Sequence, residues 1–368
     1  MRIALLGDIA AFGKYCLRND KNLLNYFDHI KKYLSIFDLV IANLEAPFVV
    51  NEKPISGKSA TVCAHPKNIE LIKYLGITHL NLANNHIGDY GLDGYERTVE
   101  LIEDNNLKWF GTENKQLNLN YDGEKVALMG FCSFNTNPSP VKSKSKFGLN
   151  YLDVNKVIEN LKDNDEKGYF NILSVHSGQE HIHMPSSDDV KFARHLANQF
   201  NYVYYGHHPH VIQGFERVNK SAIFYSLGNF IFDDVYTSKD KEKPLIALSE
   251  SNKTGGIGEI EINNGVIKKS CITPIYLDEN KMLVGDEVQT ADLSEYDSHL
   301  RNAGSDEYNH ERSRAISSYI SSRKEMRDFK WYISRLNLNS LGIIIKSKLN
   351  SFLYNKHFSS KLKTMEID

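Results

Sequence analysis

The sequence LNLANNHIGDYG, at residues 80–91, decides how the rest of the chain is interpreted. Apolar residues lead directly into Asn84, Asn85 and His86, and Asp89 follows between two glycines. This pattern is typical of a buried strand that ends abruptly at polar side chains. Taken alone, an Asn-Asn-His cluster after a strand is more often a turn whose side chains cap backbone groups than a set of ligands.

Four other apolar runs end in the same way. IALLG ends at Asp8, LVIANL at Glu45, ILSV at His176, and YVYYG at His207, His208 and His210. Ligands of open α/β sheets gather at the carboxyl ends of the strands. Five such endings therefore predict that these polar side chains meet in one place.

Length and composition describe an ordinary globular protein. The 368 residues, 41% apolar and 24% charged, suffice for one large domain with an appendage or for two domains. A formal charge of −2 predicts no affinity for nucleic acid. The four cysteines form no CxxC pair, so we expect buried, reduced thiols. Because MRIALLGD enters a strand at once and no segment is apolar over a membrane-spanning length, we expect a cytoplasmic protein.

Strand and helix patterns alternate along the first hundred residues. Strands are expected at residues 3–6, 37–44 and 78–83, and helices at 22–37, 68–75 and 92–105. Such alternation favours a layered α/β core. Turn residues at Asp122-Gly123, Asn219-Lys220 and Asn264-Gly265 predict hairpins, so the sheets should be mixed.

The C-terminal part differs in character. We divide the chain into a domain at 1–290 and a basic helical extension at 291–368. Residues 319–368 hold ten Lys or Arg against four Asp or Glu, a surplus of six, which leaves −8 for residues 1–318 of the −2 total. Within residues 340–358 a helix would place Lys346, Lys348 and Lys356 beside an apolar face of Leu341, Ile344, Ile345, Leu349, Phe352 and Leu353. That face suits an anionic membrane or a partner groove, but a helix docked on its own domain is the commoner case.

The polar strand endings supply oxygen and imidazole donors. Such donors hold divalent ions such as Mn²⁺, Fe²⁺ or Zn²⁺. The candidate ligands are Asp8, Glu45, Asn85, His176, His208 and His210. Glu45 is the candidate bridging carboxylate, and Pro209 should keep His208 and His210 in an extended segment while His207 points away. Each residue taken singly would more often be a helix cap or a hydrogen-bonded core residue.

Six short motifs follow one another along residues 1 to about 235. They are GD at Asp8, NLE at 43–45, ANNH with DYG at 83–91, HSGQE at 176–180, GHHPH at 206–210 and YSLGNF at 225–230. Together they resemble the CapA/PgsA family, which is named for poly-γ-glutamate capsule biosynthesis and belongs to the calcineurin-like metallophosphoesterase superfamily. Residues beyond about 290 resemble no family that we can name.

This resemblance implies a fold and a set of roles. The fold would be a four-layer α/β/β/α sandwich with a centre of one or two divalent ions at the strand ends. The six candidate ligands match the family's metal-binding positions, His86 matches the catalytic acid, and Asp89 would orient it. Glu180 would place the substrate or the attacking water, with Asn84, His207 and Asn229 as substrate contacts. Phosphoesterases carry a histidine where this chain has Ala10, which puts one of the two metal sites in doubt.

Two functions follow from the resemblance. The first is a metal-dependent hydrolase of capsule or surface-polymer biosynthesis, which attacks a phosphoester or an amide in an anionic polymer or a phosphorylated small molecule. The alternative is a non-catalytic subunit that binds polymer and assists assembly or export beside a capsule synthase. Family members often carry an N-terminal membrane anchor; here the basic C-terminal helix could provide peripheral contact with the inner membrane face.

One further segment resembles a functional motif. Gly57-Lys58-Ser59 is similar to the end of a phosphate-binding loop, but Glu52 stands where that loop needs its first glycine. No strand leads directly into the segment either. We therefore assign it no function from the sequence.

Overall fold

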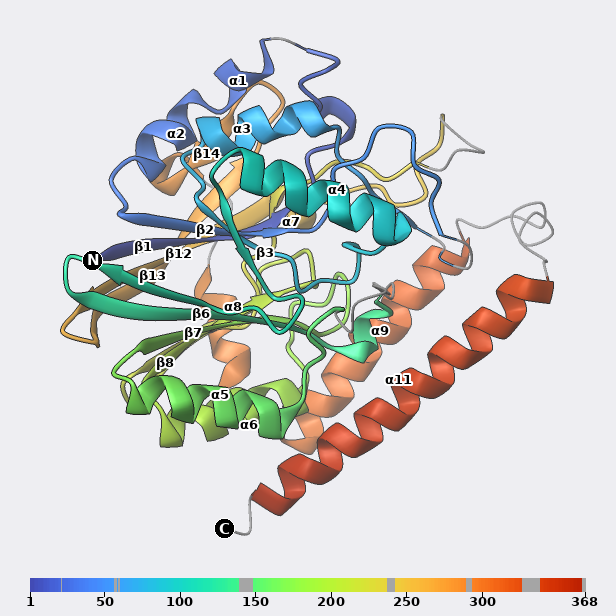
Figure 1. Ribbon diagram of the computed structural model, residues 1–368. Helices are drawn as coiled ribbons and strands as arrows, with labels where there is room; N and C mark the ends of the chain where they lie inside the picture. The colour runs from blue at the N-terminus through green and yellow to red at the C-terminus, as the bar shows by residue number, and fades with distance from the viewer. Residues whose placement is uncertain are drawn as a thin grey trace.

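Two β-sheets lie face to face, and helices cover the outer side of each (Figure 1). The computed structural model describes residues 1–20, 22–55, 58, 60–138, 148–236, 242–288, 293–325 and 338–365. Over these residues the chain forms the four-layer α/β/β/α sandwich that the resemblance implies, with helices at its C-terminal end.

The first sheet has eight strands in the order β14-β13-β12-β1-β2-β3-β4, and β11 also pairs with β1. Its parallel strands are β1 (Arg2–Ile9), β2 (Leu39–Leu44), β3 (His79–Asn81), β4 (Lys108–Phe110) and β11 (Asn229–Ile231). The antiparallel strands are β12 (Thr254–Asn263), β13 (Val266–Leu277) and β14 (Met282–Val284). Strand β1 therefore lies well inside the sheet.

The second sheet has six strands in the order β5-β6-β7-β8-β10-β9. They are β5 (Leu117–Tyr121), β6 (Glu124–Cys132), β7 (Phe170–His176), β8 (Tyr202–His207), β9 (Phe215–Val218) and β10 (Ser221–Phe224). All three predicted hairpins are confirmed, as β5–β6, β9–β10 and β12–β13. Asp122 and Gly123 both take positive φ, 47° and 88°, as a tight two-residue hairpin turn requires.

Six helices cover the sheets. Over the first sheet lie α1 (Leu23–Tyr26), α2 (Asp28–Leu34), α3 (Ile69–Tyr74) and α4 (Gly91–Asp104), and over the second lie α5 (Val154–Glu166) and α6 (Ser187–Gln199) (Figure 1). The single helix predicted at residues 22–37 is wrong. Phe27 leaves helical geometry between α1 and α2 because its fully buried ring packs against Tyr15 and Tyr26.

The continuous apolar run of β1 follows from its position between two cores. Ile3 and Leu5 face the second sheet, whereas Ala4 and Leu6 face the helical layer. Successive strand residues point to opposite faces, so a strand buried on both sides is apolar at every position. The four cysteines are free; Cys16 and Cys132 are buried, and Cys63 and Cys271 are half-buried.

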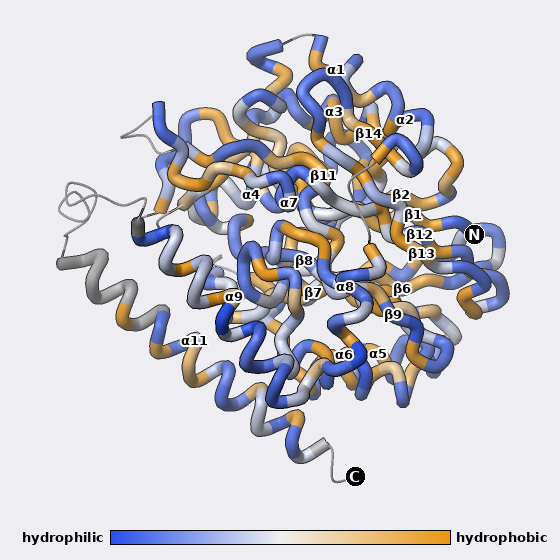
Figure 2. Tube along the Cα trace, turned by 180° about the vertical axis from the view of Figure 1, so that it is seen from behind, coloured by the Kyte–Doolittle hydropathy of each residue, from blue (hydrophilic) through white to orange (hydrophobic). Residues whose placement is uncertain are grey.

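The chain ends in α8 (Leu293–Leu300), α9 (Asp306–Glu325) and α11 (Leu338–Met365), after a short α7 (Glu250–Lys253). Helices α9 and α11 lie on the same side of the molecule (Figure 2). The predicted docked helix is confirmed for one end of α11, where buried Phe358 and Leu362 join the core of α5 and α6. Among the described residues, no helix combines the length and apolar character that a membrane span requires.

The predicted apolar face of α11 lies on the side of the helix opposite the buried Phe358 and Leu362. Ile345, Leu349, Phe352 and Leu353 are each more than half exposed. The side chains of Leu341, Ile344 and Lys346 lie outside the described residues. The helix thus presents one apolar side to the protein and a second one to solvent.

Candidate metal centre

The ends of β1 and β2 bring the first polar residues together. Asp8 pairs in register with Asn43 on one side and with Asn229 on the other. The strand predicted to stop at Leu6 continues to Ile9, so Asp8 lies inside the sheet. A Cβ at Gly7 would lie 2.1 Å from the carbonyl oxygen of Gly228, so glycine is required for this close approach of β1.

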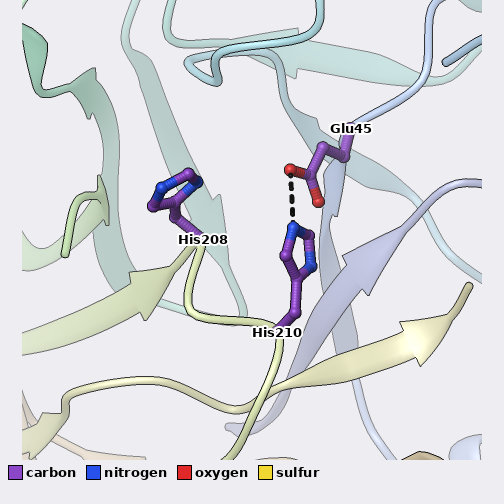
Figure 3. Close-up of side chains that lie close together, drawn as sticks. All are labelled: Glu45, His208 and His210. Carbon is purple, nitrogen blue, oxygen red and sulfur yellow. Dashed lines mark ion pairs between the residues drawn. The ribbon is translucent and has the colours of Figure 1, made fainter. Parts of the chain in front are cut away.

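Glu45, His208 and His210 converge at the centre (Figure 3). One ligand atom from each lies within 4.8 Å of the others, and all three residues are buried. Within the described residues, no other group of three His, Cys, Asp or Glu side chains comes so close together. Both carboxylate oxygens of Glu45 and Nδ1 of His208 are buried without a hydrogen-bond partner among the described residues. Because buried polar atoms are normally paired, this donor set fits a divalent ion.

His210 is oriented by the residues around it. Its Nδ1 lies 2.9 Å from Oδ1 of Asn229 and 3.4 Å from Oδ2 of Asp8, which leaves Nε2 3.6 Å from Oε1 of Glu45. A hydrogen bond from one ring nitrogen to an oxygen fixes the tautomer that leaves the other nitrogen able to bind a metal.

Asp8 is surrounded by donors. Asn43 donates to Oδ1 over 2.8 Å, the backbone N–H of His208 donates to Oδ2 over 3.2 Å, and Nδ1 of His207 lies 3.2 Å from Oδ1. Burial raises the pKa of Asp8, but His207, His210 and Asn43 together outweigh it, and the net pKa is lowered. Asp8 therefore carries its negative charge inside the protein.

His176 and Asn85 complete the cluster from the second sheet and from the segment after β3. Nε2 of His176 lies 2.9 Å from Oδ1 of Asn85 and 3.6 Å from Oε1 of Glu45. Burial, followed by the neighbouring histidines, lowers the pKa of His176 well below its ordinary value. Burial likewise raises the pKa of Glu45 well above its ordinary value, and the charge of Asp8 adds to the effect. The six side chains expected as ligands thus lie in one connected cluster.

The segment after β8 turns sharply. The extended conformation predicted for His208-Pro209-His210 is wrong, because His208 and His210 have φ values of 95° and 56°. Pro209 excludes a helix but permits a turn, and its carbonyl accepts a hydrogen bond from the N–H of His181 over 2.7 Å. Left-handed backbone at two bulky residues is costly, and it is most often found at functional sites.

His86 and Asp89 form a pair beside the cluster, and Lys58 joins them. Nδ1 of His86 lies 2.6 Å from Oδ2 of Asp89, and Nζ of Lys58 lies 2.7 Å from Oδ1. Burial raises the pKa of Asp89, but Lys58 and His86 outweigh it and lower this pKa to about 2. Burial, then Lys58, lowers the pKa of His86. Lys58 also donates to the carbonyl of Asn85 over 2.6 Å. The sequence gives no signal for these contacts, because Lys58 lies 27 residues before Asn85.

A cleft with about 630 Å³ of space free of protein atoms opens beside these groups. Asn85, His86, Glu180 and His210 line it, together with Lys58. The burial of Glu180 raises its pKa, but the surrounding histidines, His208 first, outweigh this and lower the pKa to about 2. The half-buried Glu180 therefore adds a negative charge at the edge of the cleft.

The three expected substrate contacts do not line the cleft. Asn84 donates to the carbonyl of Leu44 over 2.8 Å and caps the N–H groups of His86 and Ile87. Asn229 pairs with His210, as described above. His207 does not point away as expected, because its fully buried ring contacts Asp8 and packs on Tyr205 at 4.1 Å.

The C-terminal helices hold the segment that carries Glu180. His181 stacks on Tyr319 of α9 at 4.8 Å, and His183 stacks on Tyr296 of α8 at 4.7 Å. Tyr308 donates to the carbonyl of Pro185 over 2.7 Å. Arg312 of α9 also donates to this segment, at the carbonyl of Met184, over 3.0 Å. The sequence gives no signal for these contacts, which join positions more than 100 residues apart.

Ala10, the position at which the resemblance would lead us to expect a histidine, is fully buried. No metal ligand can come from this side chain.

A family model and two relatives of known name match the sequence of this chain. The model of the family described as bacterial capsule synthesis protein PGA_cap matches residues 2–234. Capsule biosynthesis protein CapA of Bacillus anthracis is 29% identical over 272 residues, which cover 70% of this chain and 65% of that protein. PGA biosynthesis protein CapA of Bacillus subtilis strain 168 is 26% identical over 288 residues, 76% of this chain and 74% of that one. The chain thus spans about 65% of the Bacillus anthracis relative's length.

Two solved structures align with this chain at low similarity. A hypothetical protein from Thermus thermophilus aligns with a TM-score of 0.47 at 14% identity, over 77% of this chain and 100% of its own. The NAD nucleotidase of Haemophilus influenzae aligns with a TM-score of 0.41 at 16% identity, over 88% and 60%. The match of the family model, which includes Asp8, Glu45, His176, His208 and His210, is the one that identifies the chain. This protein belongs to the bacterial capsule synthesis protein family PGA_cap.

Proposed function

We propose that the protein is a metal-dependent hydrolase that acts in the assembly of a capsule or surface polymer of the poly-γ-glutamate type. The observation that carries this proposal is the group Glu45, His208 and His210, in which both oxygens of Glu45 and Nδ1 of His208 are buried without a hydrogen-bond partner among the described residues. The His86–Asp89 pair lies beside this group. The bond attacked would be a phosphoester or an amide. The family and the names of the CapA relatives support the place in capsule assembly.

Glu45, His208 and His210 would hold one Mn²⁺, Fe²⁺ or Zn²⁺ ion, with Asp8, Asn85 and His176 beside them. When bound, such an ion lowers the pKa of a coordinated water toward neutrality and stabilises charge that develops on a phosphoryl or carbonyl oxygen. The protein supplies the fixed donors, because Asn229 and Asp8 orient His210.

His86 acts as the catalytic acid and donates a proton to the leaving group. Asp89 binds Nδ1 of His86, so Nε2 is the nitrogen that can reach a substrate. Lys58 holds Asp89 in its ionised form, which keeps the ring oriented. Glu180 lines the same cleft and would position the attacking water or the substrate.

A specific observation favours a second function, that of a non-catalytic subunit which binds polymer and assists a capsule synthase. The buried Ala10 removes one expected histidine, so a second ion would lack a ligand. A site with a single ion can stabilise a binding cleft without driving turnover.

One experiment separates the two functions. Purified full-length protein is loaded with Mn²⁺, its metal content is measured, and it is incubated with bis(p-nitrophenyl) phosphate or with poly-γ-glutamate. Turnover that disappears on chelation supports the hydrolase. Stoichiometric metal with no turnover of either substrate contradicts the hydrolase and supports the binding subunit.

A further inference from the structure

The cleft beside the metal centre has two unlike walls. Asn85, His86, Glu180 and His210 form a polar wall. The apolar part of the lining, which we call the apolar wall, consists of Ala60, Val62, Phe232, Val235, Ile246 and Leu248. None of these apolar residues belongs to the motifs that place the metal ligands.

Two segments, 232–235 and 245–248, provide four of the six residues of the apolar wall. The N–H of Val235 donates to the carbonyl of Ile246 over 2.8 Å, and the N–H of Leu245 donates back to the carbonyl of Val235 over 2.7 Å. Asp234 accepts a hydrogen bond from the N–H of Leu248 over 2.7 Å. These bonds hold the two segments together at the cleft.

Phe232 connects this wall to the metal centre. Its ring lies 4.7 Å from the ring of His210, centroid to centroid, and the residue is 4% exposed. Ile246 and Leu248 are half-buried and keep apolar surface available to a ligand. A substituent on a bond cleaved near His210 would therefore lie close to the apolar ring of Phe232.

The charges of the cleft do not suit a chain of anions. Among the described lining residues, the one Lys or Arg is Lys58, and its ammonium group is paired with Asp89 over 2.7 Å. Glu180 adds a negative charge to the polar part of the lining. An anionic polymer running along this cleft would meet a carboxylate and hydrocarbon, and burying its charges there without partners would be costly.

We propose that this cleft takes a phosphoester of an apolar alcohol, whose hydrocarbon part lies on the wall of Phe232, Val235, Ile246 and Leu248 while the phosphoryl group lies at the metal centre. The inference rests on the proposed function for the reacting end of the substrate. Of the two expected substrate classes, the inference favours a small phosphorylated molecule over a stretch of anionic polymer. Binding energy comes from apolar surface removed from water.

Two probes of equal charge test the inference by binding, with no need for turnover. The affinities of phenylphosphonate and methylphosphonate for the full-length protein are measured by calorimetry, with and without Mn²⁺. We expect phenylphosphonate to bind at least about tenfold more tightly, because the ring adds several buried carbon atoms. A short poly-γ-glutamate oligomer should bind more weakly than phenylphosphonate.

A matched pair of variants locates the effect. Leu248→Ser should remove most of the preference for the phenyl probe and leave the affinity for methylphosphonate unchanged. Leu101→Ser changes a half-buried leucine of α4 outside the cleft and should leave both affinities unchanged. Thermal unfolding shows whether each variant is folded.

The outcomes distinguish the inference from the proposed function. Equal affinity for the two phosphonates, no measurable binding of either, or tighter binding of the polymer overturns the inference. A phenyl preference that depends on Leu248, in a protein that hydrolyses neither a phosphoester nor an amide, supports the inference and contradicts the proposed hydrolase. A phenyl preference in a protein that binds none of Mn²⁺, Fe²⁺ and Zn²⁺ overturns the inference, because no ion would then hold the phosphoryl group.

Discussion

Two parts of the candidate site are held in place by different means. Glu45 and His208 stand at the ends of β2 and β8, where the backbone is fixed by neighbouring strands on both sides. Glu180 lies in the loop after β7, and that loop is held by side chains of α8 and α9. The candidate metal ligands are thus held in place by the sandwich, whereas the edge of the cleft is held by the C-terminal helices.

The largest effect is expected from Glu45→Gln, which tests the strand-end cluster directly. Removing this carboxylate takes away a ligand whose oxygens have no hydrogen-bond partner among the described residues. We expect turnover to fall by about a thousandfold. Mn²⁺ should raise the melting temperature of the natural protein but not that of the variant.

The control for this prediction is Glu100→Gln, at an exposed position of α4. It should leave the metal-dependent shift in melting temperature unchanged. An Mn²⁺-induced shift that survives in Glu45→Gln would show that the ion binds somewhere other than the strand ends.

His86→Ala separates metal binding from proton transfer. The variant keeps every residue of the Glu45, His208 and His210 group, so metal content should stay the same. Turnover should fall by about a hundredfold, because a positioned acid or base contributes on that order. Elemental analysis and initial rates on the same sample measure both quantities.

The exposed histidine of α9, His310, provides the matched control. His310→Ala should change neither metal content nor rate. If His86→Ala turns over at the natural rate, His86 has no role in the reaction.

Tyr319→Ala tests the second part of the comparison. The variant loses the ring that stacks on His181, next to Glu180, while the strand-end ligands are untouched. We expect about a tenfold loss of turnover with unchanged metal content, because small displacements of positioning groups reduce rates. Tyr319→Phe keeps the ring and should restore the natural rate.

Tyr121→Ala, at an exposed hairpin position far along the chain, controls for the loss of a tyrosine as such. Full turnover in Tyr319→Ala would show that the loop after β7 holds its position without α9. The edge of the cleft would then not depend on the C-terminal helices.

The smallest effect is expected for α11, for which the sequence predicts contact with a membrane surface. Leu349, Phe352 and Leu353 are exposed on the same side as Lys356, opposite the docked Phe358. An apolar stripe with lysine suits an anionic lipid surface. Phe352→Ser should lower sedimentation with anionic vesicles about fivefold and should leave thermal stability unchanged.

Phe358→Ser is the matched variant on the docked side of the helix. It should lower thermal stability, because Phe358 is buried against Phe192. If the natural protein does not sediment with anionic vesicles any better than with neutral ones, the membrane prediction is contradicted.

Much of the fold could be predicted from the sequence because its signals are local. The continuous apolar run of β1 and the Asp-Gly turn between β5 and β6 act through neighbouring residues. The splitting of α1 from α2 was not predictable, since it depends on where the ring of Phe27 packs. Local propensity yields to tertiary packing at such positions.

The sequence by itself determined which residues could bind a metal, because Asp8, Glu45, His176 and His208 each follow an apolar run that must become a buried strand. Only the tertiary structure decided which other groups join them. Lys58 reaches Asp89, and Tyr319 reaches His181, through contacts between side chains that are distant along the chain. Strand periodicity is encoded residue by residue, whereas such pairings exist only after both sheets and the C-terminal helices have packed.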